Sequence, residues 1–330
     1  MKRRDVIAMF GGAGAVAVAW PLVARAQQPA MPVIGYLGAE SPERFALRLR
    51  AFHQGLESTG FHEGKNVAIT YRWAEGHNDR LPALASDLVR SGVSVIAAPG
   101  GVPGALAAKA ATSTISIVFE MGADPVAMGL VASLSRPGGN VTGVTSLNAE
   151  VAPKRLELLH ELVPAATRFG LLVNPTNPKN AAATTSEIET AARRLGLGVD
   201  VLQASTEHDF DDVLAAVART KAPLVIANET FFANRSEQLA ALATRYAVPA
   251  AHQSREFVAA GGLLGYGGSV VQSHSQAGVY TGRILAGEKP ADLPVQQVTK
   301  VEMYVNLRSA KMLGLDVPLS LIGRADEVFE

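Results

Sequence analysis

Short apolar runs alternate with amphipathic stretches along the first half of the chain. Between the runs, apolar residues recur every three or four positions, as Phe45, Leu49 and Phe52 do, which is the period of a helix that buries one face. The apolar runs predict strands at residues 33–37, 67–73, 93–98 and 116–120, with helices beginning near residues 43, 79 and 102. Such alternation predicts a parallel sheet wrapped by helices, with right-handed crossovers.

The second half of the chain repeats this pattern. The predicted strands lie at residues 169–173, 199–203, 224–227, 248–251 and 263–266, and the predicted helices at 152–162, 177–195, 209–219, 236–246 and 254–259. The tail, with a helix at 271–285, a strand at 301–305 and a last helix after Asn306, is too short for a third lobe. The sequence therefore predicts an α/β fold of two doubly wound, Rossmann-like lobes, which we place at residues 27–145 plus about 270–293 and at residues 146–269 plus about 294–330.

Residues 115–146 join the two halves. The apolar strand in this segment ends before Asp124, and an aspartate followed by proline is a typical helix start, because the carboxylate caps free amides and proline suits the first helical position. A turn cluster at 136–140 and a strand at 141–145 follow. We expect a short helix after Asp124 and a crevice at the carboxyl end of the strand before it.

The chain begins with the pattern of a secretory signal peptide over residues 1–26. Basic residues at 2–4 precede an apolar run at 6–23 and a small-residue site that ends at Ala26. A membrane anchor is the alternative, but glycines and Pro21 interrupt the run, which favours cleavage after Ala26. We therefore expect a periplasmic protein, and the arginine pair leaves both the Sec and the twin-arginine export routes open.

Composition narrows the function. The chain has 30 basic and 30 acidic residues and no cysteine, so we expect no nucleic-acid partner, no disulfide and no thiol chemistry. Its seven histidines show no pair at metal-ligand spacing. The sequence contains neither a nucleophile elbow nor another catalytic constellation. These observations favour a binding protein without a metal, a cofactor or catalytic activity.

One rule nominates the candidate ligand contacts: ligands of open α/β sheets bind beyond the carboxyl ends of the strands. Helix amino termini gather backbone amides at the same edge. The nominated residues are Tyr36, Pro99, Gly100, Gly101, Asp124, Thr145, Ser146, Asn174, Asn228, Glu229, Phe231 and Tyr266.

Several of these residues also suit purely structural roles. The amides of Gly100 and Gly101 suit either an anion or a plain tight turn, since neither a dinucleotide-binding nor a P-loop spacing is present. Asp124 and Asn174 suit either a ligand or a helix cap or turn. The aromatic candidates either stack on a ligand or pack in a core.

Two similar lobes behind an export signal suggest a solute-binding protein, and a set of motifs resembles one family. The motifs are AAKAAT at 107–112, DPV at 124–126, GLVASL at 129–134, RPGGNVTG at 136–143, LVNP at 172–175, REF at 255–257, GGL at 261–263, PADLPV at 290–295 and RADEV at 324–328. They look like those of the uncharacterised or tryptophan-type substrate-binding components of ABC transporters. The resemblance covers nearly the whole chain after the signal.

The resemblance implies a type I periplasmic-binding-protein fold, with a hinge of three chain crossings and a ligand clamped between the lobes. It implies a monomer that delivers a small-molecule ligand to an ABC permease and its ATPase, and that meets the membrane only through this permease. A periplasmic sensory protein that presents its closed form to a receptor is the alternative, and an enzyme on the same scaffold is a third possibility. Two lobes joined by a few strands also predict closure on binding.

We expect the ligand to be a small zwitterion or carboxylate, amino-acid-like, with an apolar or aromatic body. The amino-acid character rests on the resemblance, and the amides at 100–101, the hydroxyls of Thr145 and Ser146 and the acid of Asp124 are the matching groups. The residues alone allow a sugar equally well, because aromatic stacking and hydrogen bonds from asparagine or aspartate suit sugars too.

Overall fold

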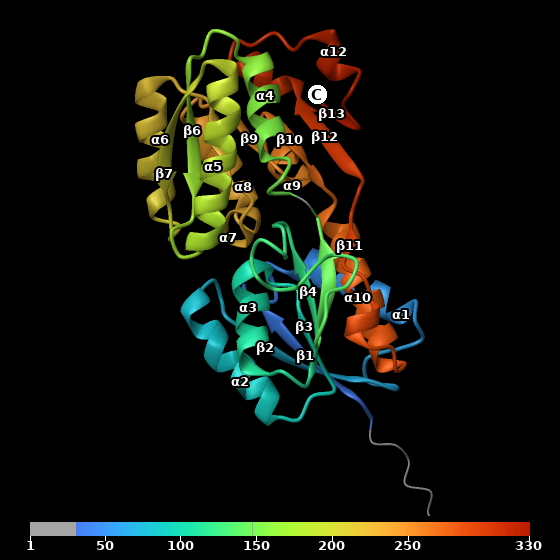
Figure 1. Cartoon of the computed structure of the whole chain (residues 1–330). Coiled ribbons are helices and arrows are strands. Elements are labelled where there is room, and N and C mark those ends of the chain that lie inside the picture. Colours follow the sequence, from blue (N-terminus) through green and yellow to red (C-terminus); the bar gives the residue numbers. More distant parts are fainter. Residues whose placement is uncertain (1–30, 147) are drawn as a thin grey trace, which may run out of the picture. The chain divides into compact units, whose positions relative to one another are not determined.

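Strand pairing divides the described residues, 31–146 and 148–330, between two sheets in the computed structural model (Figure 1). Met31–Glu330 forms one compact unit. The predicted signal peptide, residues 1–26, lies outside the described residues, and so do residues 27–30 of the predicted first lobe.

The first sheet is parallel throughout, in the order β11-β5-β4-β3-β1-β2. Its strands are β1 (Val33–Gly38), β2 (Ala68–Trp73), β3 (Val95–Ala98), β4 (Ser116–Met121), β5 (Val141–Thr145) and β11 (Gln296–Gln297). Its helical segments are α1 (Ala46–Glu57), η1 (Asn78–Arg80), α2 (Leu81–Arg90), α3 (Gly101–Ala111), α10 (Val270–Leu285) and η2 (Pro290–Asp292). Helices α2 and α3 pack on one face around Leu37, and α1 and α10 pack on the other around Ile34 and Tyr36. Both faces are covered, which is why these strands read as nearly continuous apolar runs.

The second sheet has the order β13-β12-β10-β9-β8-β6-β7, in which only the β10 and β12 pair is antiparallel. Its strands are β6 (Arg168–Val173), β7 (Gly198–Gln203), β8 (Leu224–Ile226), β9 (Ala250–His252), β10 (Leu264–Gly268), β12 (Val301–Asn306) and β13 (Glu327–Phe329). Its helices are α4 (Ala152–Leu162), α5 (Pro178–Leu195), α6 (Asp209–Thr220), α7 (Thr230–Ala233), α8 (Ser236–Arg245), α9 (Arg255–Ala259), α11 (Leu307–Met312) and α12 (Leu319–Ile322). Helices α4 and α5 cover one face, and α6, α8 and α9 cover the other.

This architecture confirms the predicted α/β fold of two doubly wound lobes, and α4 has the bounds that the periodicity predicts. The boundary near residue 294 differs, because β11 pairs with β5 through Gln296 and Val144 and so belongs to the first sheet. A strand of two residues leaves no periodic signal in the sequence. We call the parts built on the two sheets the first and second lobes.

The short helix expected after Asp124 is absent from the described residues. The Asp124 Oδ1 instead accepts a hydrogen bond from the Val126 amide at 2.8 Å, which closes a turn. Gly129 follows with a φ of +72°, in the left-handed region that ends helical winding. The aspartate therefore caps a turn where the sequence predicted a helix.

The chain crosses between the sheets after β5, after β10 and after β11, which are the three crossings that the resemblance implies. Asn148 in the first crossing accepts the amide of Gly268 at 2.7 Å through its Oδ1. Arg155 of α4 donates to the carbonyl oxygens of Asn148 at 2.8 Å and of Tyr266 at 3.0 Å. These side chains form a polar clamp that ties the first crossing to the second.

Helices α1 and α10 touch backbone to backbone in the first lobe, and this contact gives a first prediction. A Cβ atom on Gly278 of α10 would lie 2.0 Å from the carbonyl oxygen of Phe52 in α1, so Gly278→Ala is expected to lower the free energy of unfolding by about 1–3 kcal/mol. Gly104→Ala in α3 is the matched control, because nothing lies within 4 Å of its added Cβ. Urea unfolding followed by circular dichroism measures both; equal midpoints would contradict the close contact.

Candidate functional site

A cavity lies where the carboxyl ends of strands from both sheets meet. Its volume is about 40 Å³. The residues that line it are Arg48, Pro99, Gly101, Val102, Glu120, Met121, Gly122, Ala123, Ser146, Asn148, Asn177, Asn180, Asn228, Glu229, Thr230, Ala233, Gln253, Val270 and His274. Both lobes therefore contribute to one site.

Two glycines let the lobes approach each other at this cavity. A Cβ atom on Gly122, just after β4, would lie 2.1 Å from the Nδ2 of Asn228 in the second lobe. A Cβ atom on Gly101, the first residue of α3, would lie 2.7 Å from the Oγ1 of Thr230, and Gly101 has a φ of +78° that also favours glycine. These positions bring the amino terminus of α3 against the loop that follows β8.

Glu229 is the buried acid that the second lobe contributes. It follows β8, and its Oε2 accepts hydrogen bonds from the side-chain amides of Asn177 at 2.8 Å and Asn180 at 3.4 Å, which begin α5. Burial raises the pKa of Glu229 to about 7, although these amides act in the opposite direction. The carboxyl group therefore sits in an environment that opposes its charge unless a cation comes close.

Glu120 is the buried acid of the first lobe, at the end of β4. Its Oε1 accepts a hydrogen bond from the Ser273 hydroxyl at 2.8 Å, and burial raises the pKa of Glu120 to about 7. The Nε2 of His274 lies 3.7 Å from the Oε2 of Glu120, but burial lowers the pKa of His274 to about 3. The imidazole is thus neutral at physiological pH and does not neutralise the acid.

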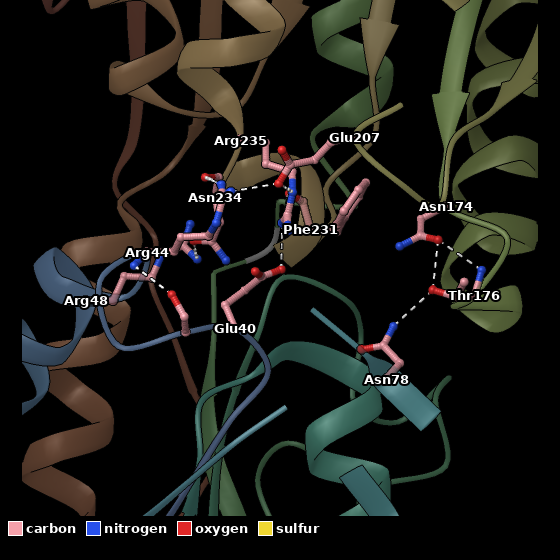
Figure 2. Close-up of polar contacts among 11 residues, drawn as sticks. Glu40, Arg44, Arg48, Asn78, Asn174, Thr176, Glu207, Phe231, Asn234 and Arg235 are labelled. Carbon is pink, nitrogen blue, oxygen red and sulfur yellow. Dashed lines mark hydrogen bonds and ion pairs between the residues drawn. The ribbon is translucent and has the colours of Figure 1, made fainter. Parts of the chain in front are cut away.

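A chain of charged side chains joins the two lobes beyond the cavity (Figure 2). The Nη1 of Arg235 in the second lobe lies 2.9 Å from Glu40 in the first, and its Nε lies 2.9 Å from Glu207. The Arg235 guanidinium also stacks over the Phe231 ring, 4.1 Å from its centre. Arg235 and Glu40 are both buried, and burial raises the pKa of Glu40 even though Arg235 acts in the opposite direction.

Further hydrogen bonds cross between the lobes around this ion pair (Figure 2). Arg48, which also lines the cavity, donates to the Oδ1 of Asn234 at 2.6 Å. Asn78 donates to the hydroxyl of Thr176 at 3.1 Å. These contacts exist only while the lobes are together, so they contribute to the closed arrangement and not to either lobe alone.

The structure places some of the nominated residues at the cavity and others elsewhere. Those that line it are Pro99, Gly101, Ser146, Asn228 and Glu229. Tyr36 lies in the core of the first lobe. The Thr145 hydroxyl donates to the carbonyl oxygen of Ala123, and the carbonyl oxygen of Tyr266 accepts a hydrogen bond from Arg155. Gly100 precedes α3, Asp124 and Asn174 cap turns, and Phe231 packs under Arg235. The rule of strand ends finds the loops that form the site but not which side chains turn into it.

Several residues that line the cavity are not among the residues that the strand-end rule nominated. Asn177 and Asn180 lie at the start of α5, Gln253 follows β9, and His274 lies one turn inside α10. The position of Gln253 directly after a strand is a signal that the same rule could have used. No periodicity or motif marks Asn180 or His274. Each lies on a helix, and tertiary packing decides which side of that helix is turned toward the cavity.

Among residues 31–146 and 148–330, no helix combines the length and apolar character that crossing a bilayer requires. In the same part of the chain, histidine and acidic side chains nowhere gather in a group that could hold a metal ion.

Known proteins resemble this chain over most of its length. A conserved domain protein from Vibrio cholerae superposes with a TM-score of 0.83 at 25% identity, over 90% of this chain and 99% of that one. The ABC domain in complex with L-Trp from Streptococcus pneumonia gives 0.81 at 23% identity, with the same coverage. A tyrosine-binding protein of Clostridioides difficile is 26% identical over 266 residues, which are 81% of this chain and 76% of that protein. Residues 41–329 match the family described as ABC transporter substrate binding protein, and this chain belongs to that family.

Proposed function

We propose that this substrate-binding protein captures a small amino-acid-like solute between its lobes and delivers it to an ABC permease. The main support is the buried carboxyl group of Glu229, which accepts hydrogen bonds from two asparagine side-chain amides in a cavity formed by both lobes. A buried carboxyl requires a cationic partner to stay ionised, and a ligand ammonium group supplies one. The amino terminus of α3 at Gly101 and Val102 provides backbone amides for a ligand carboxylate.

The relatives support this class of ligand. The tyrosine-binding protein of Clostridioides difficile is named for an amino acid and aligns over most of both chains. Its ligand carries the same ammonium and carboxylate groups that Glu229 and the start of α3 suit. This similarity supports recognition of the ammonium and carboxylate groups that all amino acids share, and it does not identify the side chain of the ligand.

Mass spectrometry of small molecules released from the purified protein tests the proposal. We expect an amino acid or close analogue, with micromolar or tighter binding when it is added back in calorimetry. Glu229→Gln keeps the shape of the side chain and removes its charge, so it should weaken that binding by about 10- to 100-fold, the equivalent of one charge-assisted hydrogen bond. A released ligand without an ionised group would refute the amino-acid proposal.

The remaining parts of the transport role are proposals as well. We propose a monomer that works with a permease and its ATPase, binds no nucleic acid and returns its ligand chemically unchanged. The cavity residues Pro99, Gly101, Ser146, Asn228 and Glu229 are the proposed ligand contacts from the sequence analysis. Incubating the ligand with the protein and weighing it by mass spectrometry afterwards tests the absence of turnover.

Export to the periplasm with cleavage after Ala26 is proposed from the basic, apolar and small-residue pattern of residues 1–26. Amino-terminal sequencing of the protein from the periplasmic fraction should begin at Gln27. An intact Met1 in membrane-bound material would refute cleavage.

We expect the ligand-free protein to be more closed at pH 5 than at pH 8. In the closed form, burial raises the pKa of Glu120 and Glu229 from 4.5 to about 7, whereas open lobes would hydrate both groups. A carboxyl whose pKa is higher in the closed form favours closure at low pH, and this contribution is lost as the pH rises through about 7. Small-angle X-ray scattering should therefore give a larger radius of gyration at pH 8.

The double variant Glu120→Gln and Glu229→Gln is the control for this pH effect. Glutamine does not titrate, so the radius of the double variant should change with pH much less than that of the wild type; the remaining dependence comes from Glu40, whose pKa burial also raises. A wild-type radius that is also unchanged would show that the two acids do not govern closure.

A further inference from the structure

The cavity wall is polar and apolar in about equal parts, and its described residues include no large aromatic ring. Among the described residues that line it, none is phenylalanine, tyrosine or tryptophan. Its apolar members are small or aliphatic: Pro99, Val102, Met121, Ala123, Ala233 and Val270. The volume of the cavity, about 40 Å³, is a few times what one water molecule needs. A compact ligand fits such a site, whereas a phenol or indole would find neither a flat apolar surface nor room.

Asn180, which lines this cavity, has a buried acceptor without a partner. Its Nδ2 donates to the carbonyl oxygen of Asn228 at 2.7 Å and lies 3.4 Å from the Oε2 of Glu229. Both partners are acceptors, which fixes the orientation of the amide. The Oδ1 therefore points the other way, and this atom is buried without a hydrogen-bond partner among the described residues. A buried carbonyl oxygen of this kind calls for a donor on the ligand.

His274 presents a second acceptor from another element. Its Nδ1 lies 2.9 Å from the carbonyl oxygen of Val270, so Nδ1 carries the hydrogen. In the neutral ring the Nε2 is then an acceptor, and this buried atom also has no hydrogen-bond partner within the described part of the chain. The Oε2 of Glu120 lies 3.7 Å from it. Two acceptors thus lie close together in the residues that form this part of the cavity wall, apart from the pair at Asn180 and Glu229.

We propose that the ligand is a compact amino acid whose side chain ends in a hydroxyl or amide donor, and that aromatic amino acids are excluded. The inference rests on the proposed function. The ligand ammonium lies at Glu229 and Asn180, and the side-chain donor lies at His274 and Glu120. The specificity of this chain therefore differs from that of its tyrosine-binding relative, although the recognition of the common amino-acid part is shared.

Calorimetry with the intact mature protein, freed of bound ligand by unfolding and refolding, tests the inference with a defined panel. L-serine and L-asparagine should bind at least 100-fold more tightly than L-tyrosine and L-tryptophan. L-alanine, which matches serine without its hydroxyl, should bind at least tenfold more weakly than serine. Tyrosine or tryptophan binding as tightly as serine or asparagine would overturn the inference and leave the proposed function standing. No binding by any amino acid at millimolar concentration would overturn both.

Two variants test whether the donor on the ligand's side chain binds His274 and Glu120. His274→Phe keeps a ring of similar size and removes the acceptor, so the preference for serine over alanine should fall to less than threefold. Glu120→Gln should reduce the same preference and serves as the second variant if His274→Phe does not fold. Glu187→Gln is the matched control, because this half-buried acid of α5 lies outside the cavity. This variant should prefer serine over alanine by the same factor as the wild type. An unchanged preference in both cavity variants would overturn the assignment.

Discussion

Replacing Arg235 by methionine is expected to weaken ligand binding by at least about 100-fold, because removing one partner of a buried ion pair costs about 3–5 kcal/mol. The pair joins Glu40 of the first lobe to Arg235 of the second, at 2.9 Å. When the lobes separate, water solvates Glu40, so the penalty for losing this pair falls on the closed, ligand-bound form. Arg235 also pairs with Glu207 and stacks on Phe231 within the second lobe, so a smaller loss of stability is expected there as well. Calorimetry and urea unfolding of the same variant measure the two effects.

Arg324→Met is the matched control for this prediction. Arg324 forms an ion pair of similar length, 2.7 Å, with Glu161, but both side chains belong to the second lobe and are substantially exposed. An exposed pair contributes at most about 1 kcal/mol, and opening does not break it, so ligand affinity should stay at the wild-type value. Wild-type affinity in Arg235→Met would show that this ion pair does not hold the closed form together.

The second large effect is expected for Arg155→Met, which should lower the free energy of unfolding by about 2–5 kcal/mol. Arg155 has no exposed surface and forms no ion pair in the described structure. Its guanidinium donates to the carbonyl oxygens of Asn148 and Tyr266, and burial lowers the pKa of Arg155 to about 10. Methionine fills similar space but leaves both carbonyls without a donor, and each unsatisfied buried group costs about 1–3 kcal/mol.

Urea unfolding followed by circular dichroism measures this loss over the whole chain, and the fluorescence of Trp73 in β2 shows whether the first lobe unfolds in the same transition. Arg193→Met on α5 is the control, since Arg193 is 69% exposed and its pair with Glu189 spans 3.9 Å. Its expected change is within about 0.5 kcal/mol. An Arg155 variant as stable as this control would mean that water replaces the guanidinium at the two carbonyls.

Much of the fold could be predicted because its long elements are amphipathic or fully buried. The helix at 152–162 buries Leu156, Leu159 and Leu162 at helical spacing, and α4 has the predicted bounds. The parts that could not be predicted are short. β11 has two residues, and the turn after Asp124 depends on the left-handed conformation of Gly129. Local propensity favoured a helix at Asp124, and the chain geometry a few residues later prevented it.

The site could be predicted as a set of loops but not as a set of side chains. Pro99 and Ser146 come directly after strands, and Glu229 lies in the loop that follows β8, so the rule of strand ends finds all three. Tyr36 lies inside β1, where successive side chains point to the two faces of the sheet, and it joins Ile34 in the core. An aromatic ring there contributes to packing. His274 reaches the cavity only because α10 leaves the second lobe and packs on the first, which no local pattern reveals.

The order of segments along the chain also decides when each lobe can finish folding. The first sheet begins at Val33–Gly38, but its covering helix α10 and its edge strand β11 follow the strands β6 to β10 of the second lobe. At about 5–20 residues per second, a ribosome needs roughly 15 to 50 s to proceed from Val33 to Gln297. Until α10 is made, the apolar face around Ile34 and Tyr36 is covered by α1 alone, and the second sheet still lacks β12 and β13. A nascent chain therefore carries two unfinished cores almost until its synthesis ends, and it depends on protection from aggregation until the tail arrives.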